Sequence, residues 1–334
     1  MFRFSLSKLV SLLLVSSLFV GCDHKLSESS GKINEIQVIT DELISESQKT
    51  AIDSISQTVS LDGLNEPFFE SITFIKPDFS KIPSGKNLIV ILNITSQVMK
   101  ERFIDIFSNR VILTVQKNNS PVVIKKENLF YKNQTVWFVL YSSPAQIENF
   151  LKGKFLNLLE NIRDDGIKIS LNTEHKSEYE KALSDSVKSI TGITIRIPLG
   201  FQAVTTVKSG SNLLFRRGVG TKTEEWIIIA ELAQSQNLKD STERANLRDK
   251  ILEQMILYTD GSVMKTGKVI IDKSDINYFR GDWITSPYPM AGLYTAKILK
   301  TNGKTYFVEG GIYSPSRSKV LNLLRLENML RAIR

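Results

Sequence analysis

The chain contains a single cysteine, Cys22, and this limits how its fold can be stabilised. One cysteine cannot form a disulfide within the chain, so the folded state must depend on its hydrophobic core. Hydrophobic residues make up 42% of the 334 residues, which is sufficient for such a core and for two domains of ordinary size.

The residues before Cys22 are organised as an export signal. Arg3 and Lys8 are the charged residues of the first eight, and residues 9–20 are apolar apart from three serines. A membrane-spanning helix takes about 20 apolar residues, whereas a run of this length is typical of a signal peptide. We therefore expect residues 1–21 to be a signal peptide that is removed from the mature protein.

The junction with Cys22 indicates lipidation. Gly21 is small, and residues 18–22 (LFVGC) resemble the bacterial lipobox, although Phe19 stands where leucine is usual. In that motif the cysteine sulfur receives acyl chains such as palmitate, and several chains together anchor a protein stably. We expect a chain held at a bacterial membrane through Cys22, in the cell envelope and facing the periplasm. The alternative is an ordinary signal in which the cysteine falls by coincidence.

The chain is basic, which bears on its partners. Its formal charge is +8, and loss of Arg3 and Lys8 with the leader lowers it by two, to +6. Because an exported protein rarely meets nucleic acid, this charge favours envelope proteins, glycans or anionic lipid headgroups as partners. The alternative is dispersed solubilising charge, since the chain has no long run of lysine and arginine.

The predicted fold class is α+β, with two units of antiparallel or mixed sheet covered by helices. A polar, serine-rich tether over residues 22–33 precedes them. The first unit is expected over residues 34–190 and the second over residues 191–334. No later segment is apolar over a length that could span a membrane.

Apolar runs and turn residues mark the main elements of both units. Leu88 to Ile94 and Thr135 to Tyr141 are continuous apolar runs, which indicates buried central strands. In the second unit, Asn302-Gly303 predicts a tight hairpin between two long strands, and a leucine-rich helix follows it.

Other signals predict element boundaries. Ser143 is expected to cap a helix, with Gln146 completing a capping box, and Asp164-Asp165-Gly166 is expected to end that helix. Residues 111–115 and 167–171 are then expected to be extended strands.

A strand, a Tyr-Ser-Pro corner and a leucine-rich helix occur twice in this order. The corners are Tyr141-Ser142-Ser143-Pro144 and Tyr313-Ser314-Pro315. One interpretation is internal duplication, which predicts the same strand order in both units. The alternative is chance, because proline suits the first turn of any helix.

Several blocks resemble a known family. They are Ser30 to Val38, Leu214 to Arg217, Arg280 to Trp283 and Val308 to Pro315. They resemble a family of Bacteroidota lipoproteins known as a domain of unknown function. The stretch Pro287 to Gly292 departs from the glycine-rich pattern of that family. The resemblance implies envelope localisation and no established activity.

The second unit also resembles a second group. Its order of elements from Gly192 onward is similar to the PsbP-like α/β/α sandwich, with an extended entry ending in Pro198-Leu199-Gly200-Phe201. PsbP-like domains are mostly binding or assembly modules, so the resemblance implies a module of that kind.

Few residues offer catalytic chemistry. The histidines are His24, in the tether, and His175, in a loop between helices, so a nucleophile–histidine–acid arrangement is not expected. Acylation would occupy the thiol of Cys22. We expect no catalytic residues, no cofactor and no metal site. A hydrolase of envelope polymers acting through paired carboxylates stays open as the alternative, although we interpret Asp164-Asp165 as a helix stop and Glu224-Glu225 as a strand edge.

A binding surface is the better-supported kind of site. Arginine, tryptophan and tyrosine are enriched in binding hot spots. The candidates are Arg216, Arg217, Trp283, Tyr288 and Tyr313. The alternative is that Trp283 and Tyr313 belong to the core and that the arginines are solvated. The sequence thus predicts a non-enzymatic binding or assembly module of the envelope. Lipid carriage, which would need a deep apolar cavity, is a further alternative.

Replacing Cys22 tests the anchor. The Cys22→Ala chain should take up no fatty acid in metabolic labelling, because the sulfur that receives the acyl chain is gone, and it should leave the membrane fraction. A Ser17→Ala chain, altered within the leader but away from the junction, is the control and should label normally. Label on Cys22→Ala would contradict lipidation at this residue.

Overall fold

The computed structural model describes residues 26–333, apart from 42–44, 62, 76–78, 119, 174–177, 205–211, 234–237, 239, 257–260 and 317. The predicted signal peptide, Cys22, His24 and His175 lie outside the described residues. Within them, no helix combines the length and the apolar character needed to cross a membrane.

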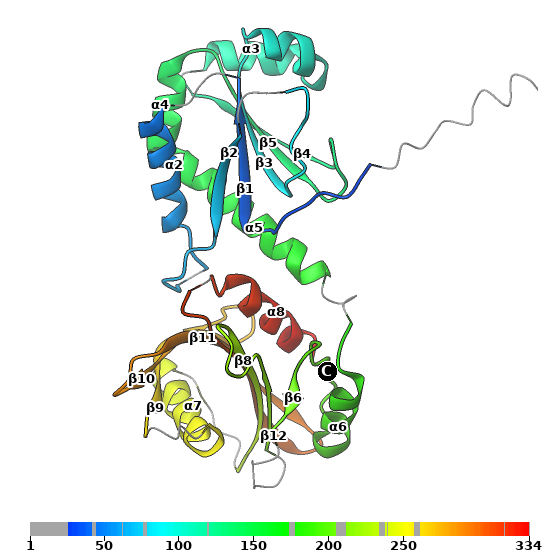
Figure 1. The fold of residues 1–334 in the computed structure, drawn as a ribbon, viewed down its shortest axis with the longest axis vertical. Helices are drawn as coiled ribbons and strands as arrows, with labels where there is room; N and C mark the ends of the chain where they lie inside the picture. Colours follow the sequence, from blue (N-terminus) through cyan, green and yellow to red (C-terminus); the bar gives the residue numbers. More distant parts are fainter. Residues whose placement is uncertain are drawn as a thin grey trace, which may run out of the picture.

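The first sheet is mixed and contains five strands in the order β2-β1-β3-β5-β4 (Figure 1). Four strands run parallel, and the edge strand β4 pairs antiparallel with β5. The strands are β1 (Glu35–Thr40), β2 (Ser71–Ile75), β3 (Asn87–Asn93), β4 (Val122–Glu127) and β5 (Thr135–Tyr141).

Helices cover both faces of this sheet, which explains the continuous apolar runs within β3 and β5. Their side chains alternate between two separate cores. On one face pack α2 (Glu46–Thr58), α4 (Pro144–Gly153) and α5 (Phe155–Thr173). On the other pack the π-helical turn η2 (Met99–Phe103), the short η3 (Ile104–Ile106) and α3 (Asn109–Lys117).

The second sheet is antiparallel throughout and contains seven strands in the order β6-β7-β8-β12-β11-β10-β9. Asn302 and Gly303 both take positive φ, and they form the predicted hairpin turn between the two longest strands. The strands are β6 (Gln202–Ala203), β7 (Leu213–Arg217), β8 (Glu224–Leu232), β9 (Val263–Ile271), β10 (Tyr278–Ser286), β11 (Ala291–Thr301) and β12 (Lys304–Tyr313).

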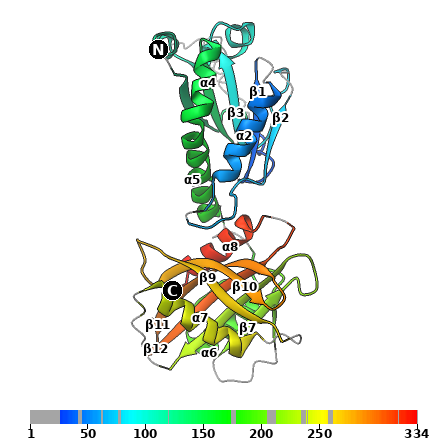
Figure 2. The same ribbon diagram turned by 90° about the vertical axis from the view of Figure 1, so that its left-hand side faces the viewer.

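Helices cover both faces of the second sheet as well (Figure 2). α7 (Ser241–Met255) packs on one face. α8 (Val320–Arg331), α6 (Lys181–Thr191) and the extended segment 193–197 pack on the other. The predicted α+β class, with a mixed and an antiparallel sheet covered by helices, is therefore confirmed.

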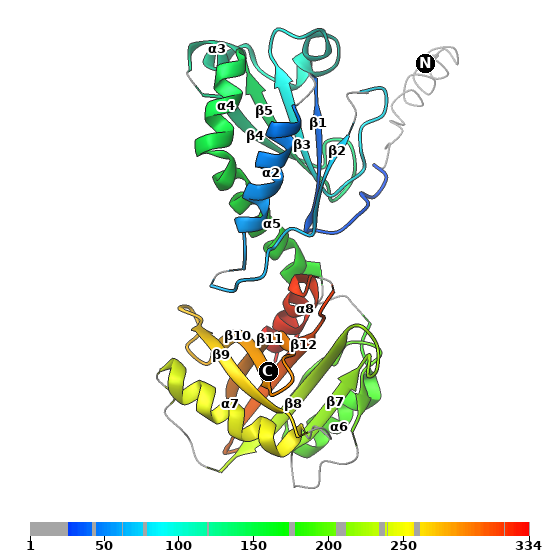
Figure 3. The same cartoon turned by 60° about the vertical axis from the view of Figure 1, so that its left-hand side comes forward.

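Helix α8 joins the two units, because it is buried on both sides. Leu323 and Leu324 belong to the core that includes α5 and the first sheet, whereas Leu326 and Leu330 belong to the core beneath the second sheet. Figures 1 and 3 show α8 lying between the second sheet and the first unit, with the end of α5 beside it. The shared core is thus continuous across the junction.

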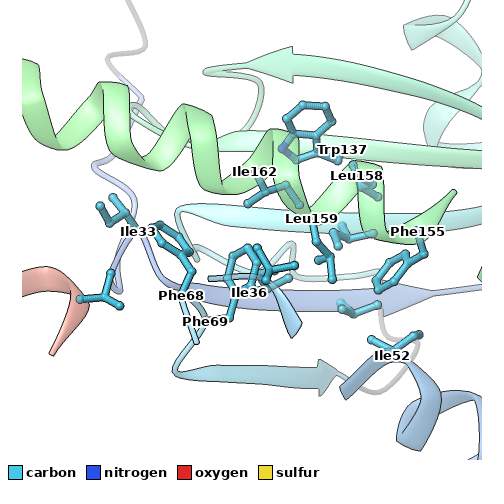
Figure 4. Packing of buried hydrophobic residues seen from close by; sticks show 14 of the residues in the cluster. Ile33, Ile36, Ile52, Phe68, Phe69, Trp137, Phe155, Leu158, Leu159 and Ile162 are labelled. Carbon is cyan, nitrogen blue, oxygen red and sulfur yellow. The ribbon is translucent and has the colours of Figure 1, made fainter. Parts of the chain in front are cut away.

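The close-up in Figure 4 shows the first-unit side of this core. Leu158, Leu159 and Ile162 of α5 pack toward the first sheet, and Phe68 and Phe69 fill the space at its end. The rings of Phe68 and Phe69 meet edge to face with centroids 5.0 Å apart.

Helix α5 corrects the predicted helix stop at Asp164-Asp165-Gly166 and the predicted strand over 167–171. The helix continues through both to Thr173. Gly166 serves packing and does not end the helix. A Cβ at this position would lie 3.3 Å from the Phe68 ring and 3.4 Å from the Ile33 carbonyl oxygen, so the glycine lets α5 approach both residues closely.

The predicted strand over 111–115 is also wrong, because these residues lie in α3. Val111, Ile112 and Val115 pack on the first sheet at helical spacing, while Leu113 is exposed. Packing of one face therefore outweighs the strand preference of the β-branched residues.

The predicted capping box at Ser143 does not form. The Ser143 side chain makes no capping hydrogen bond, although Pro144 begins α4 as expected. Gln146 is buried instead, where its amide oxygen accepts from the Ser142 N–H at 2.6 Å and its amide nitrogen donates to the Asn118 carbonyl oxygen. Gln146 thus ties α4 to the end of α3.

The two sheets have different strand orders and directions, which contradicts internal duplication. The shared strand–proline–helix corner is a local solution for starting a helix after a strand.

Helix α6 packs with the second sheet, although the predicted bounds of the first unit, residues 34–190, include it. Its Val187 lies in the core with Phe215 and Ile227. We therefore place α6 with the second sheet, ahead of the predicted boundary at residue 190.

Part of the predicted tether is ordered against the first unit. The Lys132 N–H donates to the Ser27 carbonyl oxygen at 2.8 Å, and the Ser29 N–H donates back to Lys132 at 2.9 Å. Glu28 binds the Lys132 ammonium at 2.7 Å. Backbone pairing thus holds residues that composition alone predicts to be flexible.

A buried ion pair fixes α7 to the second sheet. Arg248 of α7 and Glu309 of β12 are fully buried, and Nε and Nη2 of Arg248 donate to the two carboxylate oxygens at 2.7 and 3.0 Å. The indole N–H of Trp226 donates to the same carboxylate at 3.1 Å, and the guanidinium lies 3.9 Å from the centroid of the Tyr294 ring.

Removing one member of this pair should destabilise the protein strongly. In Glu309→Ala the Arg248 charge stays buried without a partner, so the free energy of unfolding should fall by about 3–5 kcal/mol. In the double variant Arg248→Met, Glu309→Leu no unpaired charge is left, and the loss should be smaller. Denaturant unfolding measures both.

The exposed pair between Lys181 and Asp185 on α6 provides the control. Asp185→Ala should leave the free energy of unfolding almost unchanged, because solvent screens an exposed pair. Equal losses for Glu309→Ala and Asp185→Ala would contradict the importance of the buried pair.

Candidate functional site

A small pocket on the α7 face of the second sheet gathers aromatic rings. We call it the aromatic pocket, and its volume is about 90 Å³. It is lined by Arg216, Glu224, Trp226, Ile256, Trp283, Met290 and Tyr313.

Two glycines make room for its tryptophans. A Cβ at Gly311 would lie 2.1 Å from the Trp226 ring, and one at Gly292 would lie 2.4 Å from the Trp283 ring. The indoles therefore lie flat on bare backbone of β12 and β11, which side chains would otherwise cover.

The rings form a row. The centroids of Trp226 and Trp283 are 5.4 Å apart, and those of Trp283 and Tyr313 are 6.2 Å apart. Both indole N–H groups are used inside the protein, by Glu309 for Trp226 and by the Leu293 carbonyl oxygen, at 3.3 Å, for Trp283. The pocket consequently offers mainly apolar ring surface.

Arg216 adds a charge at the pocket. It stands directly opposite Trp226 in the β7–β8 pairing, and its Nε donates to Glu224 at 2.7 Å. Its side chain keeps 35% of its surface exposed. An arginine placed so can also bind a carboxylate brought by a partner.

The structure brings three of the five predicted site residues together, namely Arg216, Trp283 and Tyr313. Tyr288 lies on the adjoining loop and is 60% exposed, while Met290 of the same loop lines the pocket. This loop is closed by Thr285, whose N–H donates to the Met290 carbonyl oxygen at 2.8 Å.

Arg217 lies on the opposite face of the sheet and does not join the others. Adjacent residues of a strand point to opposite faces. Arg217 pairs there with the buried Glu225 and lies over the Phe201 ring. Burial raises the pKa of Glu225, and the attraction of Arg217 opposes this effect.

A larger pocket lies where α5 meets the second sheet and α8. We call it the seam pocket, and its volume is about 520 Å³. It is lined by Ile167, Ile270, Ile271, Asp272, Lys273, Tyr278, Arg280, Glu327 and Arg331.

The acids of the seam pocket are held by arginines. Arg331 binds Asp272 and Glu327, and Arg280 binds the other oxygen of Glu327 at 3.3 Å. Partial burial would raise the pKa of Asp272, but hydrogen bonds from Ser274 and Arg331 outweigh it and hold that pKa well below its ordinary value.

The other acid pairs are also engaged. Asp164 binds Arg163 at 2.9 Å, Asp165 binds Lys125 at 2.6 Å, and Glu224 binds Arg216. Across the described ranges, no group of three or more histidine, cysteine, aspartate or glutamate residues is placed to hold a metal ion.

Comparison with known proteins adds a family match for the second sheet. Residues 180–332 match the model of a family described as "Domain of unknown function (DUF4837)". The match begins at α6, in agreement with the packing of that helix, and it supports a domain-of-unknown-function family for this part of the chain. No curated protein matches the chain.

Solved structures show only a distant likeness. The Ran-binding protein Mog1p of Saccharomyces cerevisiae has 13% identity and a TM-score of 0.30, and a variant of protein Mog1 has 14% identity and the same TM-score; each covers 42% of this chain and 89% of its own. The Mll3558 protein from Rhizobium loti has 12% identity over 46% of this chain and 81% of its own, with a TM-score of 0.13. At these TM-scores the likeness carries no argument about function.

Asp272 should make stability depend on pH in the acid range. Its pKa is lower in the folded state than in the unfolded chain, where it is about 3.9. Its stabilising contribution is therefore complete above that value and is lost as pH falls toward the folded pKa. The difference in free energy of unfolding between the wild type and Asp272→Asn should be largest near pH 7 and should shrink below about pH 4.

Urea unfolding between pH 7 and pH 2.5 measures this effect. Asp53→Asn, a change at an exposed position of α2, is the control and should give a small difference at every pH. A difference for Asp272→Asn that stays constant down to pH 2.5 would contradict the assigned contacts.

Proposed function

We propose that this protein is a non-enzymatic binding module of the bacterial cell envelope, anchored to a membrane through lipid on Cys22 and facing the periplasm. We further propose that the aromatic pocket is where it holds a partner protein. The anchor and the location rest on the leader and lipobox-like sequence. The binding role rests on the geometry of the second sheet.

The size and lining of the aromatic pocket carry the proposal. At about 90 Å³ it is smaller than the cavity of roughly 150 Å³ that holds a benzene ring. It therefore suits one aliphatic side chain of a partner, anchored against Trp226, Trp283 and Tyr313. Tryptophan, tyrosine and arginine are the residue types enriched in the hot spots of protein interfaces, and all three line this pocket.

Features around the pocket fit this role. Tyr288 projects from the adjoining loop with 60% of its surface exposed, so it can contact a partner seated over the pocket. The Arg216 guanidinium, which donates to Glu224, can donate to an incoming carboxylate as well. An acidic residue next to an aliphatic one is the partner chemistry that this arrangement favours.

The alternative of a polymer hydrolase finds less support. It would need one carboxyl group that is protonated and another that is free to act on the substrate. In the larger pocket Asp272 and Glu327 are both bound by Arg331, and the lowered pKa of Asp272 keeps it ionised at neutral pH.

Site-specific photocrosslinking in cells tests the aromatic pocket. A photoreactive phenylalanine in place of Tyr288 should crosslink to an envelope protein. Adding Arg216→Glu should reduce that crosslink at least about tenfold, because it removes one charge-assisted contact and repels an acidic partner. The product is measured by immunoblot against the wild-type background.

Lys222→Glu is the matched control, since it makes the same charge change in the exposed turn between β7 and β8. It should leave the crosslink intact. Equal losses for Arg216→Glu and Lys222→Glu, or a product that is lipid or glycan alone, would overturn the proposed protein partner.

A further inference from the structure

We propose that the seam pocket binds an anionic amphiphile, a molecule with one carboxylate or phosphate group and a short apolar chain. This site is separate from the aromatic pocket, and neither proposal depends on the other.

The place and size of the seam pocket suit a small molecule. Its volume of about 520 Å³ falls within the range of roughly 300–1,000 Å³ that is typical of ligand sites. Its walls come from both units, with α5 on one side and β9, β10 and α8 on the other. Junctions between packed units are common positions for such sites.

One wall offers apolar surface. Ile167 of α5 and Ile270 of β9 are partly buried against the shared core and form this wall. The backbone of Gly63 packs closely against Ile270, since a Cβ at Gly63 would lie 2.7 Å from the Cδ1 atom of Ile270. This contact limits the movement of the Ile270 side chain. Partly exposed isoleucines on a fixed wall can be covered by an alkyl chain, which removes apolar surface from water.

The charges of the described walls favour an anion. Three cationic residues face two acidic ones, which leaves one positive charge in excess. Asp272 and Glu327 are already engaged by Arg331, so a cationic ligand would have to displace an arginine.

Two cationic donors remain for the ligand. Lys273 is exposed and forms no ion pair with a described residue. Arg331 uses Nε and Nη2 for the two acids, whereas its Nη1 has no acceptor among the described residues. An acid group at the mouth would therefore lie between Lys273 and Arg331, with its chain along the isoleucines.

The seam pocket is less suited to a flat aromatic ligand that would stack on a ring. The Tyr278 ring is covered by the guanidinium of Arg331, which lies 4.3 Å from the ring centroid. This leaves the aliphatic wall as the apolar surface available, and it favours a chain over an aromatic ring system.

Calorimetric titration of the whole protein tests the proposal with defined probes. Dodecanoate and dodecyl phosphate, below their micelle concentrations, should each bind saturably with one molecule per protein. Dodecyltrimethylammonium, with the same chain and the opposite charge, should bind at least about tenfold more weakly. Tighter binding of dodecanoate would identify a fatty acid as the natural class, and tighter binding of dodecyl phosphate a phospholipid-like headgroup.

Matched variants locate the site. Lys273→Glu should weaken binding of both anions by about tenfold or more, through loss of one charge-assisted contact. Lys268→Glu makes the same charge change on β9 outside the pocket lining and should leave binding unchanged. Both lysines are exposed, so these chains should fold normally.

Three results would overturn the proposal. They are no saturable binding of either anion, equal binding of the ammonium probe, and equal effects of Lys273→Glu and Lys268→Glu. The first excludes the ligand class, the second excludes recognition of the acid group, and the third excludes the pocket as the site. None of these results bears on crosslinking through Tyr288, so the two proposals fail or stand separately.

Discussion

Burial of α8 on both sides is the constraint on which the rest of the structure depends. A helix that contacts one sheet needs a single apolar stripe, but α8 presents Leu323 and Leu324 to the first unit and Leu326 and Leu330 to the second. The Asn328 side chain also donates to Ser170 of α5 at 3.2 Å. Because the same helix completes both cores, the two sheets are stabilised together, and the space beside the helix becomes the seam pocket.

The aromatic pocket depends on a different interaction, the buried pair between Arg248 and Glu309. Glu309 accepts from both Arg248 and the Trp226 indole, so one carboxylate fixes α7 and orients a wall of the pocket. Buried pairs of this kind often contribute little net stability compared with an apolar replacement. We therefore infer that the ion pair between Arg248 and Glu309 serves to position Trp226 rather than to increase the free energy of unfolding.

Much of the fold is predictable because its signals are local. The apolar runs of β3 and β5 and the Asn302-Gly303 turn specify their elements without reference to distant residues. Residues 111–115 and Gly166 could not be interpreted this way, since packing against the first sheet and Phe68 decides their conformation. For the site, composition identifies arginine and aromatic candidates, whereas the register that sets Arg216 opposite Trp226 is a property of strand pairing. Trp226 was missed for that reason, while strand alternation could already have separated Arg217 from Arg216.

The position of β10 explains how one sheet can carry the two proposed binding sites. Tyr278 and Arg280 point to the face of α8 and line the seam pocket, whereas Trp283 points to the face of α7 and lines the aromatic pocket. Between Arg280 and Trp283 the pairing of β10 with β9 is irregular. There the Asp282 side chain accepts a hydrogen bond from the Lys268 N–H at 2.7 Å, which links the two strands. A ligand on one face therefore does not obstruct the other, so the two proposed sites can be occupied at the same time.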